Sequence, residues 1–392
     1  MKEGWVYKKL GDVCNVVGGG TPDTKNNDYW GGKIPWATVG DMNCDVLKST
    51  GYYITDRGLN ESSSRIINSG EIIIATRVGL GKVCKLAIDT AINQDLKGII
   101  PKDNDILRAF LFYYFKQKAK YIIDNGVGAT VKGVKIKFIE ELPFGYPPLS
   151  EQQSIVDYLD SAFAKIDMMK ANAEKALNEA KALFQASLKD MLEPKEGWEE
   201  KMLKEVVASI TDGDHQPPPK SDDGIPFITI SNIDKNSNKI AFGETFYVPQ
   251  SYYCALKKDR IPQQGDVLYT VTGSFGIPVL IDFQKDFCFQ RHIALIRPKI
   301  GVLSPTYLFY WILSSYATSQ AENTATGAAQ RTVSLNSLRN FTIHIPTFST
   351  QQSIVETLDS LKSKVDRLQE NYDKISQECD ALKQAILRQV FE

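Results

Sequence analysis

The stretch best equipped for acid–base or metal chemistry is "TDGDHQPPP", residues 211–219. Asp212, Asp214 and His215 place two carboxylates and an imidazole within four residues, a set that could bind a metal ion or transfer a proton. The comparable place in the first half of the chain reads "GGGTP" and has neither a carboxylate nor a histidine. The alternative is a turn whose polar groups act locally, and the difference between the two halves favours that interpretation.

The rest of the chain lacks the known catalytic motifs. The glycine-rich "VVGGGTP" (16–22) is not followed by the Gly-Lys-Ser/Thr of a phosphate-binding loop, and GxSxG, HExxH and GxGxxG do not occur. The Asn/Asp-Pro-Pro-aromatic tetrad of amino-methyltransferases is also missing. We therefore expect no catalytic residue and no metal site in this chain.

Composition points to the cytoplasm. The six cysteines are scattered without a CxxC pair, which is typical of a reduced intracellular protein. The opening "MKEGWVYKKL" has no apolar segment, so we expect no signal peptide. The apolar run "AFLFYYF" (109–115) is too short to cross a bilayer, and we expect no membrane partner.

The chain contains the same pattern twice. "PPLSEQQSIVDYLDSAFAKID" (147–167) and "PTFSTQQSIVETLDSLKSKVD" (346–366) agree at twelve of 21 positions. Other pairs occur in the same order: "KEGWVYKKLGDV" with "KEGWEEKMLKEV", "IPWATVGDM" with "IPFITISNI", and "GEIIIATRVGLG" with "GDVLYTVTGSFG". The offset runs from 193 to 199, which indicates a tandem duplication of roughly 195 residues.

Each copy ends in a long helix-forming segment. Apolar residues recur there at alternating spacings of four and three, the a/d pattern of a coiled coil. The serines of "SEQQ" (150–153) and "STQQ" (349–352), each with glutamine three residues on, predict capping boxes, and Pro194 predicts the end of the first helix. The predicted seam is Ile155, Leu159, Ile166, Met169 and Leu183 in the first helix, and Ile354, Leu358, Leu361, Val365, Leu368, Ile375, Leu382 and Ile386 in the second.

Each copy also contains a globular part. Short β-type runs such as "EIIIAT" and "DVLYTV" follow turn glycines, and one amphipathic helix is expected near 106–123 and near 306–319, the second capped by Ser304-Pro305. These features predict an α+β fold with two similar globular domains at 1–149 and 195–346. Between the two domains, long helices at 150–194 and 347–392 would pair antiparallel as a coiled coil. A pseudo-two-fold axis would then relate the two copies. The other possibility is that each helix packs on its own globular domain.

Charge is distributed unevenly although the net charge is only −1. Residues 1–149 carry a net charge of +4, residues 197–346 a net charge of zero, and the two helical segments together −5. Local basic groups in the first globular part fit contact with phosphate, or equally a solvated surface. Charge alone does not decide between these.

The motifs resemble those of the specificity subunits of type I restriction–modification systems, along essentially the whole chain. The resemblance is carried by "GGGTP" with "YWGGKIPWATVGDM" (18–42), by "DGDH" (212–215), and by the duplicated "PPLSEQQ" and "PTFSTQQ" entries to the helices. It implies two target recognition domains, each reading one half of a bipartite, asymmetric sequence in double-stranded DNA, held apart by an antiparallel coiled coil.

The same resemblance implies the partners. Such a subunit has no catalytic activity of its own and assembles with two modification (methyltransferase) subunits and with restriction (translocase and nuclease) subunits. S-adenosylmethionine, ATP and Mg²⁺ would bind to those partners, with no cofactor on this chain. The alternatives are a coiled-coil scaffold that binds only proteins, and a DNA enzyme with an unrecognised catalytic site.

Candidate DNA-contacting residues are those in loops that carry hydrogen-bonding or basic side chains. They are Thr21, Arg77, Lys82, Asn93, Gln94 and Lys132 in the first domain, and His215, Thr272, Ser274, Gln290, Arg291, Gln330 and Arg331 in the second. The duplication pairs Gln94 with Gln290 and Lys132 with Arg331. Gly128, Ala129, Gln152, Gln153, Gln351 and Gln352 are expected at the junction of domain and helix, or on a surface that faces a partner subunit.

Overall fold

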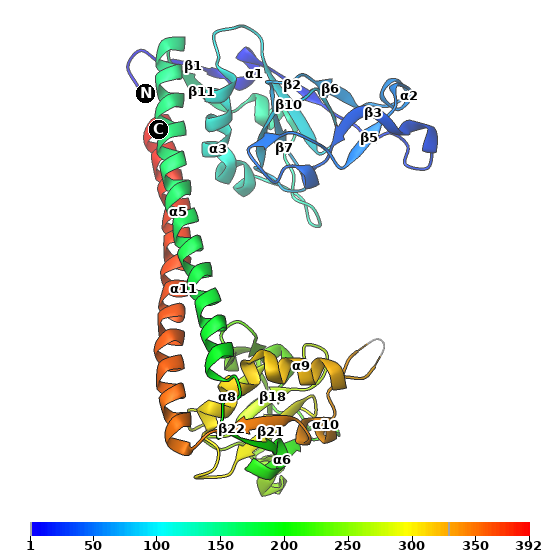
Figure 1. The fold of residues 1–392 in the computed structure, drawn as a ribbon. Helices are drawn as coiled ribbons and strands as arrows, with labels where there is room; N and C mark the ends of the chain where they lie inside the picture. Colours follow the sequence, from blue (N-terminus) through cyan, green and yellow to red (C-terminus); the bar gives the residue numbers. More distant parts are fainter. Residues whose placement is uncertain (1, 328–329) are drawn as a thin grey trace. The chain divides into compact units, whose positions relative to one another are not determined.

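The computed structural model describes residues 2–327 and 330–392. The chain forms two compact units, unit 1 from residues 1–173 and 373–392, and unit 2 from residues 174–372. Each unit contains a globular head and parts of the two long helices, α5 (Leu149–Met191) and α11 (Phe348–Phe391), labelled in Figure 1. We call residues 2–148 the first head and the described residues of 195–346 the second head.

The first head contains three sheets. A ribbon pairs β1 (Val6–Lys9) with β11 (Pro143–Tyr146), and a five-stranded sheet has the order β2-β10-β7-β8-β4. Its strands are β2 (Cys14–Gly18), β10 (Leu96–Pro101), β7 (Ile72–Ala75), β8 (Val83–Leu86) and β4 (Val46–Leu47). The third sheet, β5-β3-β9-β6, is formed by β5 (Tyr52–Ile54), β3 (Trp30–Ala37), β9 (Thr90–Ile92) and β6 (Arg65–Ile67). The helices are α1 (Leu10–Val13), α2 (Asp56–Asn60), α3 (Arg108–Asp124) and α4 (Ile136–Glu140).

The second head repeats this plan. β12 (Glu199–Met202) pairs with β22 (Thr342–Ile345), and the larger sheet has the order β13-β21-β18-β19. Its strands are β13 (Val207–Asp212), β21 (Ile293–Pro298), β18 (Val267–Thr270) and β19 (Pro278–Leu280). Two smaller sheets are β17-β14-β20, from β17 (Phe246–Val248), β14 (Ile225–Ile228) and β20 (Cys288–Phe289), and β15-β16, from β15 (Ile233–Asp234) and β16 (Lys239–Ile240). The helices are α6 (Leu203–Val206), α7 (Gln250–Ala255), α8 (Pro305–Leu313), α9 (Ser315–Thr324) and α10 (Leu335–Arg339).

The central strand of each head is buried on both faces. Ile72 and Ile74 of β7 pack with α3, whereas Ile73 and Ala75 face a separate cluster with β8 and β9. In β18 the Tyr269 side chain packs toward α8. Side chains alternate across a strand, so a strand covered on both faces needs side chains that can be buried at successive positions, as Ile72–Ala75 and Val267–Thr270 are. The prediction of strands there is confirmed.

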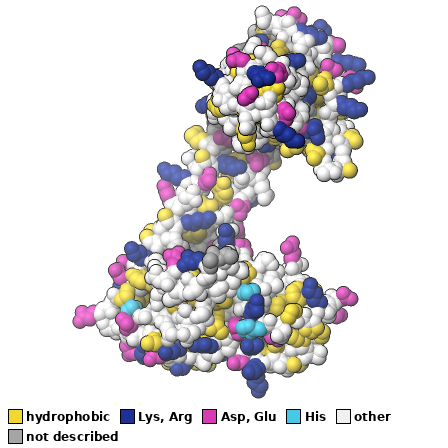
Figure 2. Space-filling view, turned by 90° about the vertical axis from the view of Figure 1, so that its right-hand side faces the viewer, with side chains coloured by type: hydrophobic (Ala, Val, Ile, Leu, Met, Phe, Trp, Pro, Cys, Tyr) yellow, Lys and Arg dark blue, Asp and Glu magenta, His cyan; other side chains and the backbone are white. Residues whose placement is uncertain are grey.

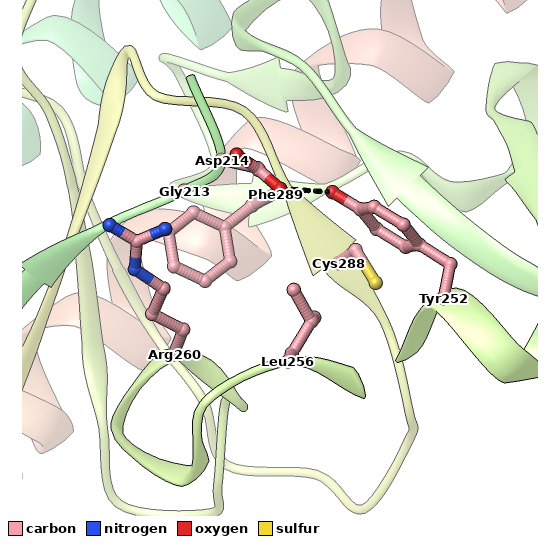
Figure 3. A pocket seen from close by; sticks show the side chains of 7 residues that line it. All are labelled: Gly213, Asp214, Tyr252, Leu256, Arg260, Cys288 and Phe289. Atoms are coloured by element: carbon pink, nitrogen blue, oxygen red, sulfur yellow. Dashed lines mark hydrogen bonds between the residues drawn. The ribbon is translucent and has the colours of Figure 1, made fainter. Parts of the chain in front are cut away.

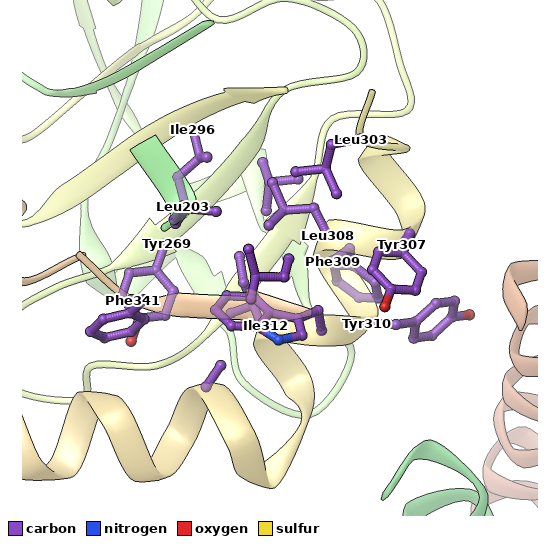
Figure 4. Packing of buried hydrophobic residues seen from close by; sticks show 14 of the residues in the cluster. Leu203, Tyr269, Ile296, Leu303, Tyr307, Leu308, Phe309, Tyr310, Ile312 and Phe341 are labelled. Atoms are coloured by element: carbon purple, nitrogen blue, oxygen red, sulfur yellow. The ribbon is translucent and has the colours of Figure 1, made fainter. Parts of the chain in front are cut away.

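The helix after the sheet differs between the heads. Ser304 caps α8 by accepting a hydrogen bond from the Tyr307 N–H, with Pro305 at the first helical position, as predicted. The single helix expected over 306–319 is wrong, because the chain breaks at Ser314 and α9 begins anew. Ser314 donates from both its N–H and its hydroxyl to the Trp311 carbonyl oxygen and adopts an extended ψ of 159°. The α8 side chains Tyr307, Leu308, Phe309, Tyr310 and Ile312 are among those drawn in the core in Figure 4, where Tyr310 lies at the edge of the cluster and its hydroxyl donates to Asp359 of α11.

The long helices pair antiparallel within each unit. In unit 1 the Cys379 thiol donates to the Ile166 carbonyl oxygen, and in unit 2 the Lys181 ammonium donates to the Gln369 side chain. The ends of the helices also complete the cores of the heads: Leu387 of α11 is buried in unit 1, and Leu188 of α5 in unit 2. The start of each helix packs on its own head, with Leu159 in the core of the first and Leu358 in the core of the second, so both arrangements expected from the sequence occur together.

The predicted seam is displaced by one residue at alternate heptad positions. Met169, Leu183 and Leu382 are exposed, by 59%, 58% and 47%, so their assignment to the seam is wrong. Leu177 and Phe184 are buried instead. Leu183 and Phe184 form an adjoining apolar pair, so the heptad pattern could not show which member faces the partner helix. After Met169 and Leu382 the partly buried residue is a lysine, Lys170 or Lys383, which a pattern of apolar residues does not include. The other seam residues, Ile155, Leu159, Ile166, Ile354, Leu358, Leu361, Val365, Leu368, Ile375 and Ile386, are buried or half-buried.

The helix caps also differ from the prediction. The helices begin at Leu149 and Phe348, one residue before the predicted serine caps. The first turn of α11 is capped by Thr347, whose hydroxyl accepts from the Thr350 N–H at 3.3 Å. Gln153 bonds to Asp157 further along its helix, so it does not complete a capping box with Ser150.

Candidate nucleic-acid interface

Four loops of the first head meet at one end of its central sheet. They are 18–23 after β2, 76–82 between β7 and β8, 93–95 before β10, and 126–134 between α3 and α4. Backbone hydrogen bonds join them: the Gly20 N–H donates to the Ile92 carbonyl, the Thr76 N–H to the Asp95 carbonyl, and the Val134 N–H to the Thr76 carbonyl, at 2.8–3.0 Å.

A glycine is required where the first loop crosses β9. A Cβ on Gly19 would lie 2.1 Å from the Ile92 carbonyl oxygen, closer than any side chain could tolerate. In the second head a Cβ on Gly213 would meet the Phe289 carbonyl oxygen at 2.0 Å. The "GGGTP" and "DGDH" stretches are therefore equivalent crossing points, and the glycine in each permits the close backbone approach.

The second head builds the same loop frame. Its loops are 212–218, 271–277, 290–292 and the described part of 326–333. The Val271 N–H donates to the His292 carbonyl at 2.9 Å, and the Val333 N–H donates to the Val271 carbonyl at 2.8 Å. This pattern makes Val271 the counterpart of Thr76 and His292 the counterpart of Asp95.

All thirteen predicted DNA-contacting residues lie in these two loop clusters. Thr21, Arg77, Lys82, Gln94 and Lys132 are exposed in the first head, as are His215, Ser274, Arg291, Gln330 and Arg331 in the second, while Gln290 is half-buried. Several touch: the Thr21 hydroxyl bonds to the Gln94 side chain, and the Arg331 guanidinium lies over the Phe275 ring. The structure thus brings together residues up to 111 positions apart in the first head.

Two of the thirteen are buried. Asn93 is only 6% exposed, and its side-chain oxygen accepts from the Asp95 N–H. Thr272 is likewise 6% exposed, with its hydroxyl accepting from the Thr332 hydroxyl. Both hold a loop in place beneath the surface, so they are removed from the set of candidate contacts. The pairing of Gln94 with Gln290 is also corrected, because the strand register aligns Asn93 with Gln290 and Gln94 with Arg291.

In the first head the loop cluster carries an excess of positive charge. Arg77 Nη1 lies 3.3 Å from Asp95 Oδ1. The Lys97 ammonium is buried and donates to the Gln94 and Leu96 carbonyl oxygens at 2.6 and 2.9 Å. Burial lowers the pKa of Lys97, an effect that the Asp95 carboxylate opposes and Arg77 strengthens. Exposed Lys82 and Lys132 stand on the flanking loops.

In the second head the Asp212 carboxylate contacts two basic side chains of the equivalent cluster. His215 Nε2 lies 2.9 Å from Asp212 Oδ2, and Arg260 Nη2 lies 3.4 Å from Asp212 Oδ1. Burial lowers the pKa of His292, and the neighbouring Arg291 and His215 lower it further. Figure 2 shows histidine side chains beside basic ones on the face of unit 2 that is turned to the viewer.

The contacts of "DGDH" are those of a polar turn. Asp214 Oδ1 accepts from the Gln216 N–H at 3.2 Å, and this backbone bond lowers the pKa of Asp214. Its other oxygen accepts from the Tyr252 hydroxyl at 3.1 Å, across a small pocket that also includes Arg260 and Phe289 (Figure 3). Within residues 2–327 and 330–392 no group of three His, Cys, Asp or Glu side chains is arranged to bind a metal ion. No helix in that part of the chain is long and apolar enough to span a membrane.

Sequence reasoning missed Asp95 and Arg260. Asp95 directly follows the candidate Gln94. A carboxylate among several candidate basic residues could have indicated an ion pair from the sequence. Arg260 is 48 positions from Asp212, and nothing in the spacing indicates that η5 (Lys258–Arg260) lies against β13.

The junction glutamines take the places predicted for them, whereas Gly128 and Ala129 lie in the 126–134 loop between α3 and α4 and not at the junction. Gln152 is fully buried, accepts from the Leu107 N–H at 2.9 Å, and donates to the Asp105 and Pro147 carbonyl oxygens. Gln351 makes the matching bonds with the Ser304 N–H and with the Val302 and Pro346 carbonyl oxygens. Each amide joins the loop before the head helix to the start of the long helix.

The chain contains two heads built on the same frame, and each is attached to a long helix. This arrangement defines an internally duplicated class of protein. The family model described as "Type I restriction modification DNA specificity domain" matches residues 2–179 and again 195–377. The chain belongs to this family.

Similar proteins agree with this assignment. The MjaIX specificity subunit of Methanocaldococcus jannaschii is 31% identical over 59% of this chain and 58% of its own length. The EcoR124I/EcoR124II specificity subunit of Escherichia coli is 32% identical over 41% of each chain. The chain thus spans about half the length of these relatives. A chain from a solved type I restriction–modification system has the same fold, with a TM-score of 0.79, 19% identity, and coverage of 100% of this chain and 98% of that one.

Proposed function

We propose that this chain is the DNA sequence-recognition subunit of a type I restriction–modification complex. In this proposal each head reads one half of a bipartite DNA target through its loop cluster. The observation that carries it is the contrast within the duplication: the backbone bonds that fix the loops recur in both heads, whereas the exposed side chains on them differ. Two different half-sites need this combination, because base-edge contacts set specificity and vary with the side chain.

The chemistry is assigned to partner subunits. The Asp212 carboxylate contacts His215 and Arg260, and the Asp214 carboxylate accepts from the Gln216 N–H and the Tyr252 hydroxyl, which supports a chain without catalysis of its own. We place S-adenosylmethionine on two modification subunits, and ATP with Mg²⁺ on restriction subunits, with none of these on this chain. The six free cysteines fit a cytoplasmic complex.

The two long helices are proposed to set the length of the unread spacer between the half-sites. Both helices are continuous, over 43 and 44 residues, and both contribute to each compact unit. A continuous helix has a fixed rise of about 1.5 Å per residue, so it can act as a length standard.

The proposal is tested by co-expressing the chain with a type I modification subunit and mapping methylated adenines across the host genome. A two-part motif with an unspecified spacer is the expected result. A continuous motif would contradict the two-reader arrangement, and methylation or cleavage by the purified chain alone would favour the enzyme alternative. A complex that binds DNA without sequence preference would favour the scaffold.

A matched deletion tests the role of the helices. Removing residues 173–179 from α5 together with 366–372 from α11 takes one heptad from each helix and keeps the antiparallel register. At about 1.5 Å per residue, the loss of roughly 10 Å should shorten the spacer by about three base pairs and leave both half-sites unchanged. An altered half-site with an unchanged spacer would exclude the helices as the length standard.

A further inference from the structure

The first head contains an ion pair that the proposed function does not yet explain. Arg77 is the second residue after β7, in the loop cluster, with its side chain 52% exposed. Asp95 lies beneath it with a side chain only 13% exposed. The carboxylate is therefore largely shielded from water, while the guanidinium reaches solvent.

The geometry of the pair leaves the donors of Arg77 available. The nitrogen–oxygen distance is 3.3 Å, yet Asp95 Oδ1 is buried and accepts no hydrogen bond within the described residues. The contact is thus one of charge, without a directed hydrogen bond. Arginine has five N–H donors in a planar fork, and within the same residues none of those of Arg77 is used in a hydrogen bond.

Arg77 is also restricted from the other sides. The Thr76 N–H and hydroxyl both donate to the Asp95 carbonyl, so the backbone beneath Arg77 is tied to the loop that carries its partner. Gly133 lies against the Arg77 side chain, where a Cβ would come within 3.0 Å of Cγ. The buried Lys97 ammonium adds a repulsive charge on the side of the loop core. Attraction from Asp95 and repulsion from Lys97 together restrict where the guanidinium can point.

We propose that Arg77 contacts the O6 and N7 edge of a guanine in the half-site read by the first head, and that Asp95 is the positioning residue that aims it. This inference rests on the proposed function. Guanine is the base whose major-groove edge presents two acceptors side by side, and the arginine fork matches them. Lys82, on the same loop as Arg77, and Lys132, on the 126–134 loop, are exposed, and in this proposal they contact phosphates, which orients the head without reading sequence.

The second head has no such pair. Its counterpart of Arg77 is the buried Thr272, and its counterpart of Asp95 is His292. The guanine contact is therefore a property of the first half-site alone, which makes the second half-site an internal control in every experiment.

The test uses the full chain assembled with a modification subunit. After the wild-type motif is mapped, each guanine of the first half-site is replaced in turn by 7-deazaguanine, which lacks the N7 acceptor, and binding of the complex is measured. At one guanine we expect affinity to fall about 5- to 10-fold, because one of the two acceptors of the bidentate contact is lost. In the Arg77→Met complex the same replacement should have almost no effect, since methionine has no donor for N7.

Asp95→Asn keeps the shape of the side chain and removes its charge. We expect it to reduce the discrimination at that same guanine, while recognition of the second half-site stays as in the wild type. The matched control is the pair at the other end of β7, Glu71 with Arg108, whose side chains are 10% and 40% exposed and 2.8 Å apart. Glu71→Gln and Arg108→Lys should lower thermal stability and leave the DNA motif unchanged.

Several outcomes would overturn the inference. They are a first half-site without guanine, a penalty that persists in full in Arg77→Met, and relaxation that appears in the second half-site. If Asp95→Asn behaves like Glu71→Gln, with lower stability and an unchanged motif, Asp95 has only a structural role and the positioning claim fails. A wild-type complex that shows no two-part motif at all would refute the proposed function instead, so the two failures are distinguishable.

Discussion

The two heads resemble each other in their backbone contacts at the loop cluster, and in their side-chain contacts at the end that joins the long helix. At the loop cluster only the backbone is repeated: Thr76 and Val271 make equivalent bonds to neighbouring loops, but the next residue is the exposed Arg77 in one head and the buried Thr272 in the other. Similarly, the buried Lys97 of β10 has Ala294 at its place in β21.

At the helix end the side chains themselves are repeated. Gln152 and Gln351 make the same set of bonds, and the Tyr113 hydroxyl bonds to Asp160 as the Tyr310 hydroxyl does to Asp359. Duplicated sequence has therefore kept the contacts that attach each head to its helix, while the loop surface was free to change. A protein that must present two different surfaces on one frame has this distribution of similarity.

The strongest test of the shared end is truncation of a matched pair of leucines. Leu159 and Leu358 are both fully buried, each in the core where a long helix meets its head. Replacing either with alanine should lower the free energy of unfolding by about 3–4 kcal/mol, because of the lost burial and the cavity left behind. Urea denaturation with hydrogen exchange in each unit measures this, and Leu183→Ala at an exposed site is the control. A large loss in one unit only would show that the two junctions are not equivalent.

The buried carboxylates Asp266 and Glu71 are expected to differ in how strongly their arginine partners stabilise each head. Asp266 in the second head is 3% exposed and accepts from Arg297 Nε and Nη2 at 2.8 and 2.7 Å, and these bonds raise the pKa of Arg297. Arg297→Met leaves a buried carboxylate without its partner, which should cost about 3 kcal/mol of unfolding free energy.

The counterpart in the first head is weaker. Glu71 is paired with Arg108, which comes from a helix and is 40% exposed, so water can replace part of the lost contact. Arg108→Met should therefore cost only about 1 kcal/mol in the same denaturation experiment. The double variant with Asp266→Asn should recover part of the loss caused by Arg297→Met. Equal losses of unfolding free energy in Arg297→Met and Arg108→Met would mean that the solvent exposure of the arginine does not decide the size of the loss.

Much of this organisation could be predicted from the sequence. The duplication, the strands "EIIIAT" and "DVLYTV", the α8 cap at Ser304 and the two long helices all follow from local patterns. The seam register could not be obtained in the same way, because adjoining residues such as Leu183 and Phe184 are both apolar and only the three-dimensional packing decides between them.

The candidate site was predictable as a set of loops but not as a set of contacts. Arg77 and Asp95 are 18 positions apart on loops after different strands, and their meeting depends on the order of the strands in the sheet. Asn93 and Thr272 have the polar side chains of surface residues, yet they act as internal hydrogen-bond acceptors, Asn93 for the Asp95 N–H and Thr272 for the Thr332 hydroxyl. The four-part division of the chain stays a prediction.

A smaller and symmetric effect is expected for the junction glutamines. Gln152→Ala or Gln351→Ala leaves one N–H and two carbonyl oxygens at the junction without a partner. Water can reach part of the cavity, so we expect about 2 kcal/mol in each unit. The exposed neighbours Gln153→Ala and Gln352→Ala serve as controls and should change the midpoint of thermal unfolding little. Similar losses from the buried and exposed glutamines would contradict a structural role for the amides.

The smallest effect is a dependence on pH that belongs to the second head alone. All three histidines lie in residues 195–346, and the pKa of His292 is lowered by burial and by Arg291 and His215. Because the folded chain holds the neutral imidazole more readily than the unfolded chain does, unfolding takes up a proton between the lowered pKa and the ordinary value near 6.5. Stability of unit 2 should therefore fall as the pH is lowered through this window. His292→Gln should remove that part of the slope, measured by urea denaturation at several pH values, whereas His344→Gln should retain it. A slope that survives in His292→Gln would assign the effect to another group.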